Sequence, residues 1–356
     1  MDRWDRFLGR VEWPRLLLVG LLVVVVSALG IGGAITMAVF HPFNPTWEGT
    51  SEWRVGIEDD PQHEVTFLQS EDDYERLTAN DTVYVFSPEE RYDEEAVQAI
   101  DDFVAAGGTL VVLENFGENG NQLLADLGVE MRFDGLVLQD EQHYDRDPKM
   151  LIANQPEEHP LTVEVAAITL NHGTAVSAPE ASVLLSTSNV TYLGEEDAEI
   201  GDDDLATYPV VAVEEIGAGQ VIAVGDPSIA INEMVHLSDN WPLLHNFARG
   251  SDRIAIDLSH TAPIPPIRLG LLMIRANAWL GSMLGILAIV SVAAIQARGR
   301  EETPFGRTTK RTGQGGSESR SPAASTPVDG AGRLESSRVD AADGTGRSYD
   351  RNERNP

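Results

Sequence analysis

The chain has 356 residues, of which 57 are acidic and 25 basic, so its formal net charge at pH 7 is −32. A surface this acidic repels the phosphate backbone of nucleic acids, which excludes nucleic-acid-binding functions. The sequence contains no cysteine, which excludes disulfides, thiolate metal sites and cysteine nucleophiles.

An apolar run at residues 16–40 follows a short segment that carries four arginines. A helix needs about 20 residues to cross a hydrocarbon core of about 30 Å, and this run is long enough. The alternative is a cleaved signal peptide, whose apolar part is typically about 7–15 residues and ends at a small-residue cleavage site. This run is longer and lacks a clear site of that kind. The sequence therefore predicts a transmembrane helix over 16–40, with residues 1–15 in the cytoplasm because basic flanks stay there.

Residues 41–53 are broken by prolines and carry aromatic side chains, which indicates a stalk at the membrane interface. The expected extracytoplasmic domain, residues 54–250, opens with two short apolar runs at 54–57 and 64–68. At this length the domain can bury a core of its own without disulfides.

Strand and helix patterns alternate through the first half of this domain. Residues 82–86 and 109–113 are apolar and predict strands, and the second suits a parallel sheet that is covered on both faces. Between them, apolar residues at helical spacing predict a helix over 92–106, which the glycines at 107–108 would end. A shorter helix is expected over 121–127.

The second half of the domain is less regular but returns to strands. The expected strands lie at 135–138, 182–186, 210–213 and 221–224, with Gly217-Ala218-Gly219 as the turn between the last two, and a helix follows over 241–249. Alternating strands and helices predict an α/β domain of the Rossmann or flavodoxin-like type with a mostly parallel sheet.

The remaining chain is expected to return to the membrane. Residues 251–275 contain a stiff proline stretch and predict a linker with an interfacial segment, and residues 276–297 predict a second transmembrane helix. Residues 298–356 lack large apolar side chains and predict a disordered cytoplasmic tail. Basic residues precede the first run and follow the second, so both termini are expected in the cytoplasm. Residues 41–267, with 8 basic and 45 acidic residues, are then outside.

A known family shares three features of this chain. They are a helix, Gly-Gly and strand at Phe103–Val112, a strand ending in Gly-Asp at Gly217–Asp226, and Asn232 followed by Asp239-Asn240. In this order they resemble the domain-of-unknown-function 4350 family over about residues 45–250. The resemblance implies a variant of the class I glutamine amidotransferase fold, similar to gliding-motility ABC-transporter auxiliary proteins, and an association with MoxR-type ATPases. It also implies a first helix near residues 58–63, which is reduced here to a polar turn.

The acidic composition suggests a habitat. It resembles that of proteins from salt-loving archaea, where high salt screens the repulsion between like charges. The sequence therefore predicts a haloarchaeal type of the family.

The turn Glu114–Gly120 corresponds to the place where amidotransferases carry their nucleophile. It contains no Cys, Ser or Thr, so acyl transfer is not expected, and we predict no catalytic residue and no cofactor. The turn lies at the carboxyl end of a predicted parallel strand, where α/β domains bind ligands. Glu114 and Asn115 are therefore candidate ligand contacts, although a glycine-rich turn with a solvent-exposed Glu is the favoured alternative.

Four polar residues after the second motif are further candidates for ligand contacts: Asp226, Asn232, Asp239 and Asn240. For Asp226 we favour the structural alternative, an N-cap or Asx-turn at Pro227-Ser228. Asp239 has a similar alternative as the cap of the following helix.

The histidines and acidic runs show no metal-binding spacing, so no metal site is predicted. His236 and His245, with Asp239 between them, could meet in space, but surface or core positions are favoured. The acidic runs 195–197 and 202–204 are expected to be solvated loops. Asn80 and Asn189 each begin a short N-glycosylation acceptor motif.

Together these features favour a membrane-anchored, non-catalytic binding or assembly module with protein partners, an accessory subunit of an envelope or transport-related complex. One alternative is a hydrolase that acts on a sugar or peptide through carboxylates near Asp226, and another is a ligand receptor. Converging carboxylates with shifted pKa values would favour the hydrolase, and a broad exposed apolar patch would favour assembly.

Overall fold

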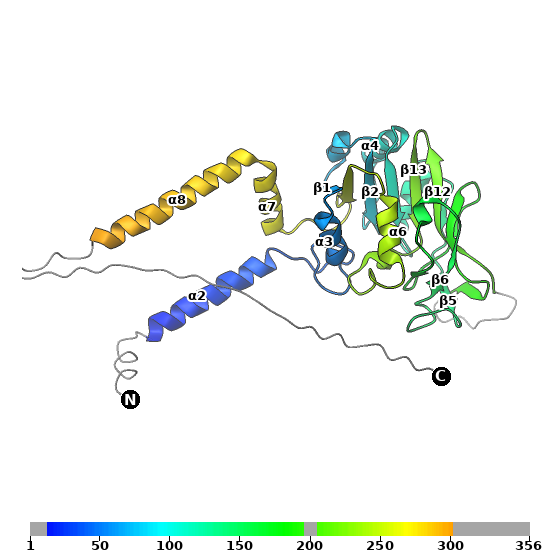
Figure 1. Ribbon diagram of the computed structural model, residues 1–356, viewed down its shortest axis with the longest axis horizontal. Helices are drawn as coiled ribbons and strands as arrows, with labels where there is room; N and C mark the ends of the chain where they lie inside the picture. Colours follow the sequence, from blue (N-terminus) through cyan, green and yellow to red (C-terminus); the bar gives the residue numbers. More distant parts are fainter. Residues whose placement is uncertain (1–12, 196–204, 302–356) are drawn as a thin grey trace, which may run out of the picture. The chain divides into compact units, whose positions relative to one another are not determined.

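The computed structural model describes residues 13–195 and 205–301, and its central feature is an eight-stranded sheet (Figure 1). In spatial order the strands are β1 (Glu64–Leu68), β14 (Arg253–Asp257), β2 (Asp81–Phe86), β3 (Thr109–Leu113), β13 (Gly219–Val224), β12 (Pro209–Ile216), β10 (Ser182–Ser186) and β7 (Gln155–Pro156). The first five pair in parallel and the last three are antiparallel. The predicted α/β fold with a mostly parallel sheet is confirmed.

Helices cover both faces of the parallel part of the sheet (Figure 1). The helices are α3 (Ser51–Asp59) and α6 (Asn240–Phe247) on one face, and η1 (Glu71–Arg76), α4 (Glu94–Ala105) and α5 (Asn119–Asp126) on the other. Strand β2 is buried along its whole length, and its successive side chains point to opposite faces of the sheet. Tyr84 and Phe86 join the core under α3 and α6, whereas Val83 and Val85 join the core under α4.

The segment between α5 and β12 forms short pieces beside this sheet. Its further elements are β4 (Arg132–Phe133), β5 (Val137–Asp140), β6 (Ile152–Ala153), η2 (Pro160–Thr162), β8 (Ile168–Thr169), β9 (Val176–Ser177) and β11 (Thr191–Gly194). They pair in twos as β4 with β9, β5 with β11 and β6 with β8. Most of the acidic run 195–197 and all of 202–204 lie outside the described residues.

The predicted linker at 251–275 is wrong in its first part, because residues 253–257 form β14. This strand pairs in parallel with β1 on one side and β2 on the other, and Ile264 still belongs to the core. The local sequence pattern did not reveal the strand, since it has only five residues and lies between a helix and a polar, proline-containing stretch. The folded domain therefore extends beyond residue 250.

The predicted stalk at 41–53 is also part of the folded domain. Phe43 and Trp53 are buried in the main core, and the Trp53 ring lies 4.9 Å from Tyr84 and 5.3 Å from Phe86, measured between centroids. The apolar run expected at 54–57 lies inside α3. The first helix of the domain, α3, therefore lies mostly before residues 58–63, where the family resemblance placed a helix.

Three helices flank the domain in sequence: α2 (Trp13–Gly32), α7 (Pro266–Ala276) and α8 (Ala278–Glu301). The expected first span, 16–40, is helical only as far as Gly32. Within the described residues, no single helix has the length and hydropathy needed to cross a membrane, and residues 266–275 and 279–294 meet those requirements only as a pair bent by 103°. The two transmembrane helices stay predictions, and residues 1–12 and 302–356 lie outside the described part of the chain.

Candidate functional site

Polar side chains stand at the carboxyl ends of four central parallel strands. Ser87 follows β2, Glu114 follows β3, Asp226 lies just after β13, and Asp257 ends β14. This is the edge at which α/β sheets tend to bind ligands. Three of the candidate residues predicted from the sequence, Glu114, Asn115 and Asp226, lie at this edge.

Glu114 is fully buried, unlike the solvent-exposed Glu of the favoured alternative. Its Oε1 atom accepts hydrogen bonds from the Ser87 hydroxyl and from the backbone amides of Asn115 and Gly117, each at 3.0 Å. Its Oε2 atom has no hydrogen-bond partner in the described structure. A Cβ atom on Gly117 would lie only 2.4 Å from Oε2, and one on Gly120 would lie 3.0 Å from the Glu114 Cβ. The glycines of this turn are thus needed to fold the backbone against the carboxylate.

Ser87 is a residue of this edge that sequence reasoning missed. Its φ angle is +37°, an unfavourable backbone conformation for a residue with a side chain. A serine on a strained turn after a strand is the geometry of a nucleophile elbow. Here, however, the hydroxyl donates to Glu114, and no hydrogen bond joins it to a histidine within the described residues. The Ser-Pro pair after the strand was the signal in the sequence.

Asn115 and Asp226 are linked through the segment Asn171-His172. The Asn115 side-chain amide donates to the His172 carbonyl oxygen at 3.4 Å, and the Asn171 backbone amide donates to Asp226 Oδ2 at 2.5 Å. The other Asp226 oxygen accepts from the Ser228 amide at 2.7 Å. Asp226 thereby caps the short helix η4 (Pro227–Ala230), which confirms the favoured structural alternative. Burial raises the pKa of Asp226 to about 7, although both backbone donors favour its charged form.

Asn232 makes its contacts away from these residues, on the segment before α3. Its Nδ2 atom donates to the Thr46 carbonyl oxygen at 2.5 Å and to the Ser51 hydroxyl at 3.1 Å, and its Oδ1 atom accepts from the Glu52 amide at 2.7 Å. The amide side chain therefore fixes the start of α3 to the loop before it.

Asp239 and Asn240 also act within the fold, against residues 166–169. Asp239 Oδ2 accepts from the amides of Ala166 and Ala167 at 2.8 and 3.1 Å, and it makes no side-chain cap on α6. Asn240 is fully buried and exchanges two 3.0 Å hydrogen bonds with the Thr169 backbone. Hydrogen bonds thus connect Glu114 to Asn115 and, through residues 171–172, Asn115 to Asp226. The other three candidates form their hydrogen bonds with other segments of the chain.

Asp257 was missed because its strand was assigned to a linker. Its Oδ2 atom accepts from the hydroxyls of Tyr74 and Tyr92 at 2.8 and 2.7 Å, and its Oδ1 atom accepts from the Ser259 hydroxyl at 2.6 Å. Burial, followed by the charge of Asp257, raises the pKa of both tyrosines well above the usual value. The Ser259 hydroxyl also contacts His260 Nδ1 at 2.7 Å. This buried network ties η1 and the start of α4 to the end of β14.

The histidine pair considered from the sequence does not meet. The Trp241 ring lies between the two, 6.3 Å from His236 and 6.4 Å from His245. His245 lies instead beside His63 and Asp60.

Both asparagines that begin a glycosylation motif, Asn80 and Asn189, are exposed.

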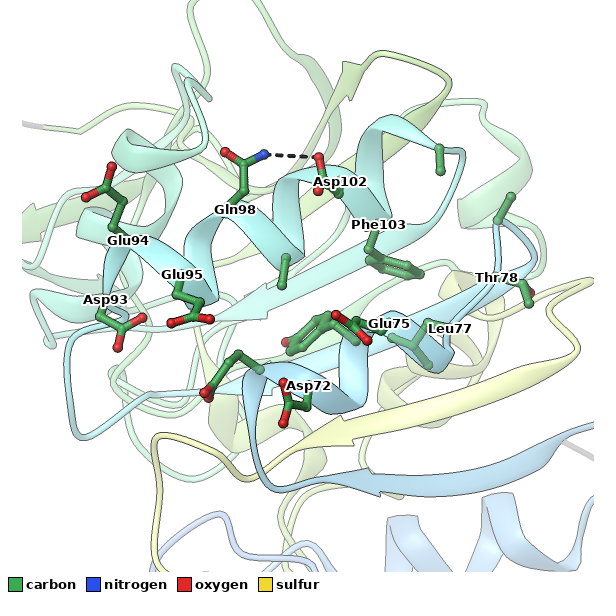
Figure 2. Close-up of a pocket in the computed structure, with 15 residues that line it drawn as sticks. Asp72, Glu75, Leu77, Thr78, Asp93, Glu94, Glu95, Gln98, Asp102 and Phe103 are labelled. Atoms are coloured by element: carbon green, nitrogen blue, oxygen red, sulfur yellow. Dashed lines mark hydrogen bonds between the residues drawn. The ribbon is translucent and has the colours of Figure 1, made fainter.

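An open groove with a volume of about 980 Å³ lies between η1 and α4 (Figure 2). Its apolar lining residues include Leu77, Ala99 and Phe103, whose ring packs edge-on against Tyr74 at 6.2 Å. Seven carboxylates line it: Glu71, Asp72, Glu75, Asp93, Glu94, Glu95 and Asp102. None of the lining residues, all within the described ranges, is basic. The groove escaped sequence reasoning because its two walls come from opposite sides of β2 in the chain.

The arrangement of this groove favours a cationic ligand with an apolar face. Basic side chains would meet the carboxylates at the rim, and apolar groups would cover Leu77 and Phe103. Figure 2 shows these two apolar side chains close to each other, with most of the labelled carboxylates of η1 and α4 to one side of them.

The model of the family described as "Domain of unknown function (DUF4350)" matches residues 42–248. No curated protein matches the chain. Among solved structures, the mmIFT52 N-terminal domain is 14% identical, aligns over 55% of this chain and 87% of its own, and gives a TM-score of 0.43. A cytoplasmic protein from Salmonella typhimurium is 14% identical over 52% of this chain and 76% of its own, with a TM-score of 0.34.

A β-galactosidase from Bacillus circulans sp. alkalophilus is 16% identical, and the match covers 48% of this chain but only 23% of that enzyme, with a TM-score of 0.27. At these TM-scores the structural similarities carry no argument about function. The family match covers more than half of the chain, and the protein therefore belongs to the DUF4350 family.

Proposed function

We propose that this protein is a membrane-anchored, non-catalytic binding module that docks a basic segment of a partner protein in the groove between η1 and α4. The observation that carries the proposal is the groove itself, which is lined by seven carboxylates together with apolar side chains. A groove of this charge repels acidic partners and attracts basic ones, so it selects partners by charge as well as by shape.

The carboxyl edge of the sheet supports binding over hydrolysis. A general acid, base or nucleophile must reach the proton or atom on which it acts. Asp226 is fully buried, and both its oxygens accept hydrogen bonds from backbone amides. Glu114 is equally buried within its own turn. These carboxylates hold turns in place, which leaves the hydrolase alternative without a reachable catalytic group among the predicted residues.

The anchoring and assembly parts of the proposal rest on the sequence. Apolar segments stand on both sides of the domain, and the basic residues beside them favour cytoplasmic termini and an external domain. A variant amidotransferase-like topology without a nucleophile at Glu114–Gly120 is consistent with a module that binds and does not catalyse. We therefore propose an accessory subunit of an envelope or transport-related complex.

Site-specific photo-crosslinking in native membranes tests the docking groove. A photoreactive amino acid replaces Gln98, which lines the groove, or Glu180, which is exposed and lies outside it. We expect a discrete crosslinked protein from position 98 and none of the same size from position 180. The crosslinked peptide should carry Lys or Arg next to apolar residues.

Neutralising two carboxylates of the groove tests whether its charge is needed for docking, and a matched change elsewhere is the control. The double change Glu75→Gln and Glu95→Gln should weaken the partner's binding by up to about thirtyfold, because exposed ion pairs contribute about 0.2–1 kcal/mol each. The double change Glu90→Gln and Glu180→Gln removes the same charge elsewhere and should leave the crosslink intact. Equal crosslinking in both double variants would show that the groove does not dock the partner.

A further inference from the structure

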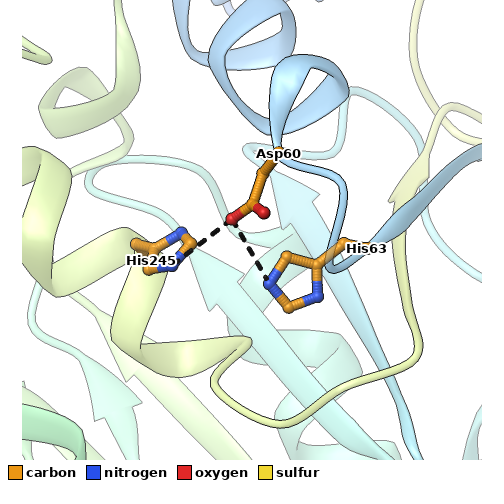
Figure 3. A group of neighbouring side chains, drawn as sticks. All are labelled: Asp60, His63 and His245. Atoms are coloured by element: carbon orange, nitrogen blue, oxygen red, sulfur yellow. Dashed lines mark ion pairs between the residues drawn. The ribbon is translucent and has the colours of Figure 1, made fainter.

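A compact cluster of one carboxylate and two imidazoles lies at the opposite end of β1 from the carboxyl edge. Asp60 follows the last residue of α3, His63 immediately precedes β1, and His245 stands in the last turn of α6. One turn of the chain, residues 60–63, and the distant helix α6 thus place three donor atoms within 4.8 Å of one another (Figure 3).

The spacing of these atoms is that of a metal site and not of a hydrogen-bonded pair. Asp60 Oδ2 lies 3.9 Å from His63 Nε2 and 3.7 Å from His245 Nε2, and Figure 3 shows one carboxylate oxygen facing both rings. Both distances exceed the roughly 2.7–3.2 Å of a hydrogen bond. Ligands about 2.1 Å from a tetrahedral Zn²⁺ ion stand roughly 3.4 Å from each other. Movements of a few tenths of an ångström would therefore bring the three atoms into coordination.

The neighbouring contacts orient the donor atoms toward a common centre. The His63 Nδ1 atom lies 2.8 Å from the Ser251 carbonyl oxygen, to which it can only donate, so Nε2 keeps its lone pair. A backbone carbonyl in this role is the usual outer partner of a metal-binding histidine. The Gln62 amide donates to Asp60 Oδ1 at 2.9 Å, which leaves Oδ2 for the centre.

The third donor, His245, is reachable from solvent. Its Nε2 atom lies 3.7 Å from Asp60 Oδ2. The side chains of Asp60 and His245 are 18% and 33% exposed, whereas that of His63 is 4% exposed. An ion can therefore enter from the His245 side and retain a water molecule there.

We propose that Asp60, His63 and His245 form a binding site for a divalent transition metal of the Zn²⁺ type. Two imidazole nitrogens and one carboxylate oxygen suit Zn²⁺, whereas Mg²⁺ and Ca²⁺ prefer oxygen donors alone. Three protein ligands leave a fourth position open. The bound ion links the turn between α3 and β1 to the end of α6, so it acts as a cross-link at the amino end of the sheet.

Metal titration of the full-length protein in detergent, carrying no histidine tag, tests the site. After removal of metals by a chelator, Co²⁺ should give a visible ligand-field absorption band that one equivalent of Zn²⁺ abolishes. Zn²⁺ at about one hundred times its dissociation constant should raise the melting temperature by about 5–10 °C.

Ligand variants identify the donors. His63→Asn keeps an amide donor for Ser251 and removes the Nε2 ligand, and Asp60→Asn keeps the acceptor for Gln62. Together with His245→Asn, these changes should each lower Zn²⁺ affinity at least about a hundredfold. His236→Asn is the control, because His236 is exposed and pairs with Glu52 outside the cluster.

Two results would overturn the proposal. The first is a wild-type protein that gives neither the Co²⁺ band nor a Zn²⁺-dependent rise in melting temperature. The second is unchanged affinity in His245→Asn, the most exposed of the three ligand positions, with a circular dichroism spectrum that matches the wild type. Loss of binding in all three ligand variants and not in His236→Asn supports the site.

Discussion

Glu114 and Asp226 direct their carboxylate oxygens at the backbone amides of their own turns or of the segment beside them. The sequence was sufficient to predict the role of Asp226, because Pro227-Ser228 follows it directly and an Asx-turn is a local structure. It was not sufficient for Glu114. Its burial depends on Ser87 from another strand and on glycines that let the chain fold back. Local chemistry can be predicted from neighbours in sequence, whereas burial is set by tertiary packing.

Asp226 should make stability depend on pH. Its pKa is about 7 in the folded protein against an ordinary value of 3.8, so the folded state holds the proton more tightly than the unfolded chain. The resulting stabilisation is present below about pH 4 and is lost as the pH rises to about 7, by at most about 4 kcal/mol. The change Asp226→Asn removes this titration. Denaturant unfolding of both proteins from pH 4 to 8 should show the wild type losing free energy of unfolding relative to the variant. A difference that is constant with pH would contradict the raised pKa.

Glu114 should be important for stability, because it is fully buried and its carboxylate accepts hydrogen bonds from Ser87 and from two backbone amides. Glu114→Ala leaves a cavity and removes the acceptor of two backbone amides, so we expect a loss of about 2–4 kcal/mol in the free energy of unfolding. Gly117→Ala should cost about 1–3 kcal/mol, because its methyl group collides with Oε2.

Combining the two changes separates this contact from general damage to the turn. In the Glu114→Ala background the added methyl group meets empty space, so Gly117→Ala should cost less there than in the wild type. Urea unfolding of the four proteins measures the coupling. Strictly additive losses would mean that Gly117 is required for another reason.

Strand β14 marks the limit of prediction at the level of elements. The strands β2, β3 and β10 and the helix α4 were predicted from local apolar patterns within about two residues of their bounds. The same kind of pattern assigned β14 to a linker outside the domain, because a five-residue strand followed by a proline stretch resembles a linker. In the sheet all five residues of β14 pair with β1, and four of them also pair with β2. Strand order depends on long-range pairing, which a local pattern does not contain.

Two fragments of the chain should test the domain boundary. Residues 41–250, close to the boundary predicted from the sequence, lack the strand between β1 and β2 and should not unfold cooperatively. Residues 41–264 include β14 and the core residue Ile264 and should show a single thermal transition by circular dichroism. A cooperative transition in the shorter fragment would mean that β14 is dispensable for the fold.

Charge governs the molecule as a whole. Residues 41–267 carry 45 acidic and 8 basic residues, and seven of these acidic residues line one groove. The sequence predicted the α/β class and the excess of negative charge, but it did not reveal the groove, whose walls meet only after folding. The same holds for the cluster of Asp60, His63 and His245, because His245 lies far along the chain from the turn that carries the other two.

The excess of negative charge should make the stability of the protein depend on salt concentration. Dilution from molar to about 50 mM NaCl lengthens the screening distance from about 3 Å to more than 10 Å, so repulsion between carboxylates grows. The melting temperature of the full-length protein should therefore fall steadily on dilution. The measurement is a thermal scan by circular dichroism across the salt series. A melting temperature that does not change over this range would contradict the halophilic interpretation.

The place of β14 also determines when the domain can be completed during synthesis. The strand is made after every other strand of the sheet, yet it must insert between two of the earliest, β1 and β2. Until residues 253–257 leave the ribosome, those two strands have unpaired backbone edges that can pair with other chains. The apolar segment that begins at α7 emerges immediately afterwards. Completion of the sheet and arrival of the second apolar segment are thus adjacent events, so a nascent chain that stalls shortly before residue 253 is the species most exposed to aggregation.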